Sequence, residues 1–307
     1  MLLTRRSFGS LLGGAVCAFA ADDRYRIGIT TNTRGGWEKD VFLSFREAKA
    51  EKYQYVESFY HYFTDYLERP AELDQKVKEI GVRFVTISNG APMEMHFEDE
   101  SKHGRIVDEH LRLVRFIKQL GCDHLKINMG PRRPEGTTDA DLKSMAKVLN
   151  EIGRRTTAEG LKFAVHAHMW SQFENRREID YIMGNTDPKH VWFVLDTGHI
   201  TMAGIDPVEL AKKLGPRIVE FHLKDVDPKH RGGAKVREEK HEPMTRPLFF
   251  PLGLGGVDFV GLKSYLDSSR WRGWLTVELD SSPTRPPHLS ARMSREYLEK
   301  ALNLRTI

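Results

Sequence analysis

Short apolar runs alternate with longer, charged segments of helical period along most of this 307-residue chain. Several of the apolar runs are continuous, such as VWFVL at 191–195, which is typical of strands buried on both faces of a parallel sheet. The helical segments often end at a glycine, the usual C-terminal stop, as at Gly81, Gly121, Gly160 and Gly215. This rhythm predicts repeated βα units.

Eight strands and four of the helices between them can be assigned from the pattern. The strands are predicted over Arg26–Thr31, Tyr53–Ser58, Arg83–Ser88, His124–Asn128, Lys162–His166, Val191–Asp196, Ile218–Leu223 and Trp274–Asp280, and the helices over Ala71–Ile80, Ile106–Leu120, Asp139–Ala158 and Pro207–Leu214. Eight units favour a single (β/α)₈ TIM barrel over an open doubly wound sheet. No Gly-x-Gly-x-x-Gly follows the first strand, so nothing favours a dinucleotide site.

The segment from Asp225 to Gly256 breaks the rhythm between the last two strands. It is rich in Lys, Arg, His, Pro and Gly. Long loops of this kind in barrels are functional lids or insertions without fixed structure. The sequence favours neither of the two.

Polar residues gather at the predicted C-terminal ends of strands five to eight. Catalytic groups of barrel enzymes lie at these ends, and consecutive strands are neighbours, so we expect the four ends to converge on one arc of the barrel mouth. Residues two apart on a strand face the same way, so both histidines of the fifth strand can point inward. The residues concerned are His166 and His168, Asp196 and His199, His222 and Lys224, and Glu278 and Asp280.

The chemistry of this set suits a metal ion without cysteine. Carboxylates and imidazoles together are ligands for Mn²⁺, Mg²⁺, Co²⁺ or Zn²⁺, and the sequence does not choose among them. One of the two cysteines, Cys17, lies in the apolar stretch near the N-terminus, which leaves Cys122. We therefore expect neither an intramolecular disulfide nor a cysteine-based metal cluster.

The N-terminal residues have the pattern of an export signal. Arg5 and Arg6, followed by Ser-Phe, precede an apolar run over 11–19 that ends in Ala-Phe-Ala. This run is too short for a lasting membrane span, which needs about 20 apolar residues. We therefore expect a twin-arginine signal over residues 1–20, a barrel over 21–307, and export to the periplasm.

Charge and composition narrow the classes of partner. The formal net charge is +4, of which two charges lie in the signal, so there is no electrostatic case for nucleic acid or an anionic membrane. A homo-oligomer is compatible with the sequence, which does not determine the oligomeric state.

Several short sequence motifs together indicate a resemblance to a known family. They are VHAHM at 165–169, REID at 177–180, LDTGH at 195–199, HLKDV at 222–226, PLGLGGVDF at 251–259 and GWLTVE at 273–278. With them the chain resembles the xylose-isomerase-like TIM barrels, often labelled sugar phosphate isomerase/epimerase, and among these the inosose dehydratases. The likeness is strong from about residue 160 to 280 and mainly architectural before that.

The resemblance implies a site and its ligands. Carried over, the metal ligands are His166, Asp196, His222 and Glu278. Epimerases of the group typically have glutamate at the first of these positions, so His166 puts a two-glutamate epimerase mechanism in doubt; His168 is the alternative ligand. His168, Lys224 and His199 match the catalytic positions of related dehydratases.

The resemblance implies a small carbohydrate or polyol as substrate, and elimination of water or an alcohol next to its ketone as the reaction. A metal polarises the ketone and stabilises the enediolate. Lys224, if its pKa is lowered, or His199 would take the proton, and His168 would protonate the leaving oxygen. Exchanging base and acid leaves the sequence argument unchanged.

The sequence leaves other functions open on the same barrel fold. They are a keto-sugar isomerase or epimerase, a lyase of 3-keto-glycosides, which export would suit, and a sugar-binding protein without activity. A DNA-repair endonuclease would need further His and carboxylate ligands and a basic face, and we find neither in the sequence. Elsewhere, Glu57 and His61 could contact the substrate. An apolar wall for a sugar ring could come from Trp37, Trp170 and Phe173, although such residues more often pack in the core or at its rim.

Overall fold

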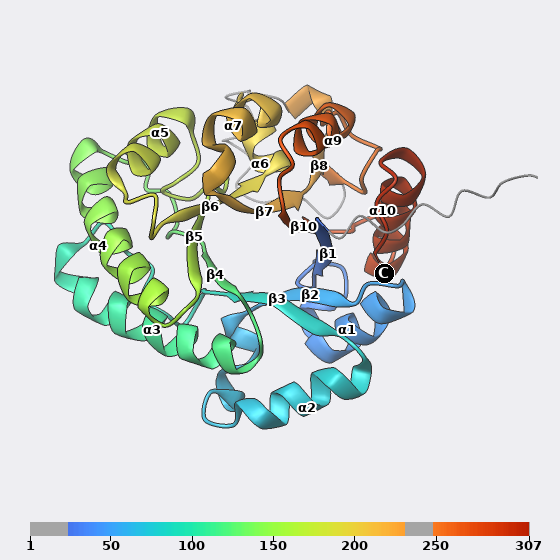
Figure 1. Cartoon of the computed structure of the whole chain (residues 1–307), viewed down its shortest axis with the longest axis horizontal. Helices are drawn as coiled ribbons and strands as arrows, with labels where there is room; N and C mark the ends of the chain where they lie inside the picture. Colours follow the sequence, from blue (N-terminus) through green and yellow to red (C-terminus); the bar gives the residue numbers. More distant parts are fainter. Residues whose placement is uncertain (1–23, 231–247, 307) are drawn as a thin grey trace, which may run out of the picture.

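Eight parallel strands form a nearly closed barrel with the helices around it (Figure 1), in the order β3-β2-β1-β10-β7-β6-β5-β4. The computed structural model describes residues 24–230 and 248–306. The strands are β1 (Tyr25–Thr30), β2 (Tyr55–Phe59), β3 (Arg83–Ser88), β4 (His124–Ile127), β5 (Lys162–His166), β6 (Trp192–Asp196), β7 (Ile218–Leu223) and β10 (Gly273–Val277). The predicted TIM barrel is confirmed, and the strand ends shift by at most three residues.

Side chains join the two strands at the edges of the sheet. The Thr86 hydroxyl of β3 donates to the His124 carbonyl of β4 at 2.8 Å, and the Ser88 hydroxyl donates to the Lys126 carbonyl at 3.3 Å. These hydrogen bonds bring β4 next to β3. The carboxyl ends of all eight strands therefore surround one mouth.

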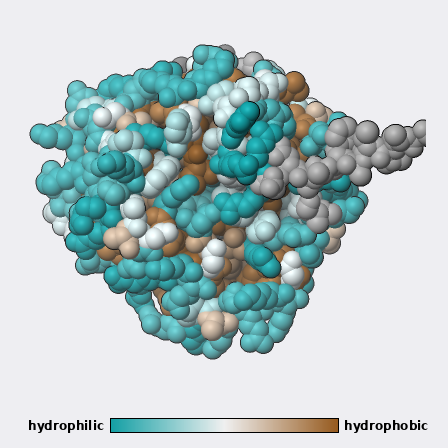
Figure 2. Space-filling view, viewed as in Figure 1, coloured by the Kyte–Doolittle hydropathy of each residue, from teal (hydrophilic) through white to brown (hydrophobic). Residues whose placement is uncertain are grey.

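The helices cover the outside of the barrel, and their exposed faces are mostly hydrophilic in the view of Figure 2. Thr138 begins α4 with a capping box that includes Asp141, and Gly81 ends α2 in the left-handed conformation, with φ of 85°. The helices are α1 (Val41–Ala50), α2 (Pro70–Ile80), α3 (His103–Gln119), α4 (Asp139–Ala158), α5 (Arg176–Asn185), α6 (Thr197–Met202), α7 (Pro207–Leu214), α9 (Phe259–Ser268) and α10 (Pro287–Ala301). The four predicted helices are among them.

The two ends of the long segment between β7 and β10 pair with each other in a small separate sheet. Strands β8 (Asp225–Val226) and β9 (Phe249–Phe250) pair antiparallel. The Asp225 carboxylate accepts hydrogen bonds from three backbone amides at 253, 255 and 257, at 2.9–3.0 Å. Residues 231–247, on which the lid prediction depends, lie outside the described residues.

The predicted signal, with Cys17, also lies outside the described residues. Among residues 24–230 and 248–306, none of the helices has the length and apolarity that crossing a bilayer requires. Cys122 is a buried free thiol in this part of the chain.

Candidate active site

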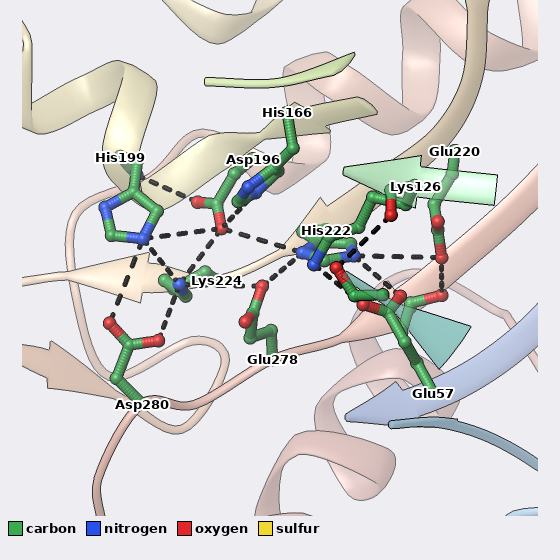
Figure 3. A network of polar contacts seen from close by, with 12 residues as sticks. Glu57, Lys126, His166, Asp196, His199, Glu220, His222, Lys224, Glu278 and Asp280 are labelled. Atoms are coloured by element: carbon green, nitrogen blue, oxygen red, sulfur yellow. Dashed lines mark hydrogen bonds and ion pairs between the residues drawn. The ribbon is translucent and has the colours of Figure 1, made fainter. Parts of the chain in front are cut away.

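Four buried residues bring one potential ligand atom each to the barrel mouth (Figure 3). His166 and Asp196 end β5 and β6, His222 lies on β7, and Glu278 follows β10 directly. Their donor atoms all lie within 4.8 Å of one another. His166 Nε2 is 3.5 Å from Asp196 Oδ2, and His222 Nδ1 contacts Glu278 Oε2. The structure thus assembles the predicted ligand set.

These four donor atoms are buried without a hydrogen-bond partner. They are His166 Nε2, Asp196 Oδ2, His222 Nδ1 and Glu278 Oε2. Ion-pair contacts join them to one another and to Lys224, but none has the geometry of a hydrogen bond. Buried polar atoms are almost always satisfied, so a converging set of unsatisfied ones fits a cation between them.

The remaining atoms of three of these residues are held by neighbours. His166 Nδ1 donates to Asn128 Oδ1 at 2.8 Å, and His222 Nε2 donates to Glu57 Oε2 at 2.9 Å. Asp196 Oδ1 caps α6 by accepting the backbone amide of His199 at 2.8 Å. Each imidazole is thereby oriented with its other nitrogen toward the site, as metal-binding histidines are.

Burial and crowding perturb the acid–base behaviour of the set. Burial raises the pKa of Asp196 to about 7, against the opposing effect of the Lys224 ammonium. Burial also favours neutral Glu278, but His222 and Lys224 hold its pKa well below the usual range. Burial and the nearby Lys126 ammonium keep the pKa of His166 far below its ordinary value, so this imidazole is neutral. A neutral imidazole is the form that binds a metal.

Lys224 is fully buried and lies between two carboxylates and one imidazole. Its ammonium is 2.7 Å from Asp280 Oδ1, 3.0 Å from Asp196 Oδ2 and 2.8 Å from His199 Nε2. These contacts place Lys224 inside the site rather than in an ion pair at the surface. Lys224 would act as the base only if its pKa were lowered, and this condition is not met: burial lowers the pKa, but the carboxylates of Asp196, Asp280 and Glu278 outweigh burial and raise it.

A second set of potential ligands surrounds this ammonium. His168, His199 and Asp280 also bring ligand atoms within 4.8 Å of one another. The sequence places these three residues at the ends of strands five, six and eight without assigning them a second metal ion. Lys224 contacts two of the three, so its positive charge lies where a second cation would otherwise bind.

His168 lies beside the four-residue set rather than within it. Its Nδ1 donates to the Met169 carbonyl at 2.6 Å, so Nε2 carries the lone pair of the neutral ring. The ring packs against that of His199 with centroids 3.7 Å apart. Between the two candidates for the strand-five ligand, the geometry therefore places His166 among the unsatisfied donors and His168 next to them.

A cavity of about 400 Å³ opens onto this arrangement. His166, His168, Glu278 and Asp280 line one part of it. Further polar lining comes from Asn32, Arg34, Lys126 and Asn128, and apolar lining from Phe59 and Trp170. The site thus combines an apolar wall with several hydrogen-bonding groups, as sites for small polar ligands do.

The other residues singled out in the sequence divide between cavity and core. Trp170 lines the cavity, whereas Trp37 and Phe173 are buried in the hydrophobic core. Glu57 does not reach the cavity lining, but it is buried beneath it and binds His222. His61 is absent from the lining.

Sequence reasoning missed Lys126 and Asn128. Both follow His124 at intervals of two residues, along an inward-facing register of β4 and its continuation. Polar residues at alternate positions of an otherwise apolar strand are the signal that could have found them. In the fold, Lys126 is paired with Glu57 at 2.8 Å.

Comparison with known families agrees with this geometry. Residues 45–301 match the family model of the xylose isomerase-like TIM barrel. The chain belongs to this family. It is 30% identical over 255 residues to an inosose dehydratase of Geobacillus kaustophilus, a match that covers 76% of this chain and 80% of that protein.

Solved structures similar to this xylose isomerase-like barrel show the same fold. A sugar phosphate isomerase/epimerase from Parabacteroides distasonis has a TM-score of 0.70 and 17% identity, over 94% of this chain and 97% of that one. The IolI protein, solved with a bound zinc atom, has a TM-score of 0.68 and 17% identity, over 91% and 98%. The prediction that the chain is an enzyme is confirmed by its similarity to the inosose dehydratase of Geobacillus kaustophilus.

Proposed function

We propose that this protein is a divalent-metal-dependent lyase that removes water from a keto-polyol of the inosose class. The observation that carries the proposal is the set of four unsatisfied, converging donor atoms beside the cavity that His168 and Asp280 line. The name of the Geobacillus kaustophilus relative supports the substrate class.

His166, Asp196, His222 and Glu278 would hold the metal ion. Two imidazoles and two carboxylates suit Mn²⁺, Co²⁺, Mg²⁺ or Zn²⁺, and the zinc in the IolI structure supports a divalent ion. When bound, such an ion supplies Lewis acidity toward a ketone oxygen and neutralises developing negative charge. Asn128 and Glu57 would keep the two imidazoles in the orientation that binding requires.

The hydrogen bonds favour His168 as base and Lys224 as acid, the reverse of our first assignment. His168 Nε2 has a lone pair because Nδ1 donates to the Met169 carbonyl, and the residue lines the cavity. It would take the proton from the carbon next to the ketone. The Lys224 ammonium would give a proton to the departing hydroxyl, which leaves as water.

His199 and Asp280 would hold the acid in place. Both accept from Lys224, at 2.8 and 2.7 Å, and Asp280 also lines the cavity. The ammonium is thereby aimed by fixed partners from two different strand ends. Such positioning is worth a large part of the rate of a proton transfer, because the catalytic group is already oriented.

Related reactions would use the same groups. An alcohol as the leaving group would make the enzyme a 3-keto-glycoside lyase, and return of the proton without loss of a group would make it an isomerase or epimerase. The test is NMR in D₂O of Mn²⁺-loaded protein with inosose and, separately, with a 3-keto-glucoside. We expect loss of water from inosose. Deuterium uptake without loss of a group would instead indicate an isomerase or epimerase. Loss of alcohol from the 3-keto-glucoside would indicate a glycoside lyase.

Matched variants make this experiment specific. Glu278→Gln should abolish turnover, because it removes a proposed ligand. Glu51→Gln is the control: Glu51 is also a buried carboxylate, but it pairs with Arg292 at 2.7 Å outside the site. Metal-loaded protein that converts neither substrate and exchanges no proton, while it still binds a sugar, would favour the sugar-binding alternative.

A further inference from the structure

Lys126 is a buried cation in the wall of the cavity. Its side chain is 1% exposed and comes from β4, on the inside of the barrel. The ammonium is 2.8 Å from Glu57 Oε1 and 5.1 Å from the centroid of the Phe59 ring. It lines the cavity together with Asn128 and His166.

The ammonium has more donors than protein acceptors. The Lys126 ammonium carries three N–H groups. Within residues 24–230 and 248–306 it makes one hydrogen bond, to Glu57. A desolvated donor without a partner is costly, so such donors are normally met by protein, water or ligand. Because Lys126 lines the cavity, its other donors are available to a molecule bound there.

Glu57 balances the charge of Lys126. It is completely buried on β2, and its second oxygen accepts from His222 Nε2 at 2.9 Å. Its first oxygen lies 2.8 Å from the Lys126 ammonium, so each carboxylate oxygen has a donor within hydrogen-bond distance. The close pair therefore presents N–H donors to the cavity with little net charge. Uncharged oxygens suit such a pair better than a carboxylate does.

We propose that Lys126 is a specificity-determining residue that donates hydrogen bonds to an uncharged oxygen, hydroxyl or ketone, of the bound polyol. This inference rests on the proposed function for its ligand class. The Lys126–Glu57 pair would then join the polyol to the metal ligand His222, which Glu57 contacts (Figure 3).

The test compares two variants with the same residue next to His222. Glu57→Gln keeps a side-chain oxygen for His222 and retains Lys126, whereas Glu57→Gln with Lys126→Met also removes the ammonium at similar volume. Binding of myo-inositol, an unreactive polyol, to Mn²⁺-loaded protein is measured by calorimetry. The metal content of each variant is measured in parallel.

We expect the double variant to bind myo-inositol about tenfold or more weakly than Glu57→Gln, at equal metal content, because a hydrogen bond from a buried charged donor is lost. Equal affinities would overturn the inference. Loss of metal from the double variant alone would also overturn it, since Lys126 would then act on the metal site. If Glu57→Gln does not fold, Lys126→Met against the wild type measures the same interaction.

Turnover separates this inference from the proposed function. Wild-type protein that binds myo-inositol through Lys126 but does not convert inosose would refute the dehydratase and keep the role of Lys126. Wild-type protein that binds no polyol would overturn the role of Lys126 as well.

Discussion

Gly198 and Lys224 are in direct contact, and the contact requires that residue 198 have no side chain. A Cβ atom on Gly198 would lie 2.7 Å from Lys224 Cγ and 2.9 Å from Cδ. Gly198 is in the first turn of α6, directly after Asp196 and Thr197. The absent side chain thus leaves the space through which the lysine reaches Asp196 and Asp280.

Gly198→Ala should therefore impair the enzyme by displacing the proposed acid. We expect turnover to fall about 100-fold, because misplacement of a catalytic group by about 1 Å has effects of this size. Overpacking should also lower the free energy of unfolding by about 1–3 kcal/mol. Gly184→Ala in α5 is the control, since its Cβ would meet no atom within 4 Å. Equal turnover in both variants would refute the role of this contact.

The assignment of His168 as base and Lys224 as acid predicts different defects when each residue is replaced. His168→Gln should stop both elimination and deuterium exchange next to the ketone, because no base remains. Lys224→Met should slow elimination by about 10²–10⁴-fold yet permit exchange, because proton removal does not need the acid. NMR in D₂O follows both processes in metal-loaded protein. Exchange in His168→Gln but not in Lys224→Met would reverse the assignment.

The fold was largely predictable because the barrel is built from local repeats. Continuous apolar runs such as 191–195 mark strands with two buried faces, and glycines such as Gly81 mark helix ends. The last strand was predicted too long, since β10 ends at Val277 and Glu278 lies just beyond it. Beyond this end the Glu278 backbone N–H still donates to the Leu223 carbonyl at 3.0 Å, and the Glu278 and Asp280 side chains line the cavity.

The site was predictable where strand ends determine it and not where pairing across the barrel does. His166, Asp196, His222 and Glu278 come together because neighbouring strands end at the same mouth. The pair of Lys126 and Glu57 joins strands two and four, and no local pattern names its partner. Likewise, the raised pKa of Lys224 follows from carboxylates on other strands, which the sequence does not place around it.

The burial of His110 leads us to predict that the folded protein loses stability in mild acid. His110 is fully buried in α3, where Nδ1 donates to the Ile106 carbonyl at 2.7 Å and Nε2 accepts from Asn89 at 3.0 Å. Both nitrogens are satisfied in the neutral ring, and burial lowers its pKa from 6.5 to about 4, despite nearby Glu109. The unfolded chain therefore binds the proton first as pH falls.

The contribution of His110 should be complete above pH 6.5 and be lost progressively as pH falls toward 4, by up to about 3 kcal/mol in total. Chemical denaturation between pH 7 and 5 measures the slope. His110→Gln, which cannot titrate, should have a flatter profile over this range, where most carboxylates remain charged. Parallel profiles for the two proteins would contradict the prediction.

We also propose that residues 1–20 export the protein through the twin-arginine route to the periplasm. Arg5→Lys with Arg6→Lys should then block export, because that route reads the arginine pair, whereas a general secretory signal needs only positive charge. Fractionation of cells that produce each full-length form measures the outcome. Export of the double-lysine form at the normal level would indicate a general secretory signal instead.

The binding of one divalent metal ion by four residues is the central claim, and a crystal structure of Mn²⁺-loaded protein with anomalous diffraction tests it most directly. We predict one manganese peak per chain, in contact with His166 Nε2, Asp196 Oδ2, His222 Nδ1 and Glu278 Oε2, with Lys224 still between Asp196 and Asp280. The unsatisfied state of these atoms is the reason for the prediction. No peak at these atoms, or a peak among His168, His199 and Asp280 alone, would contradict the account.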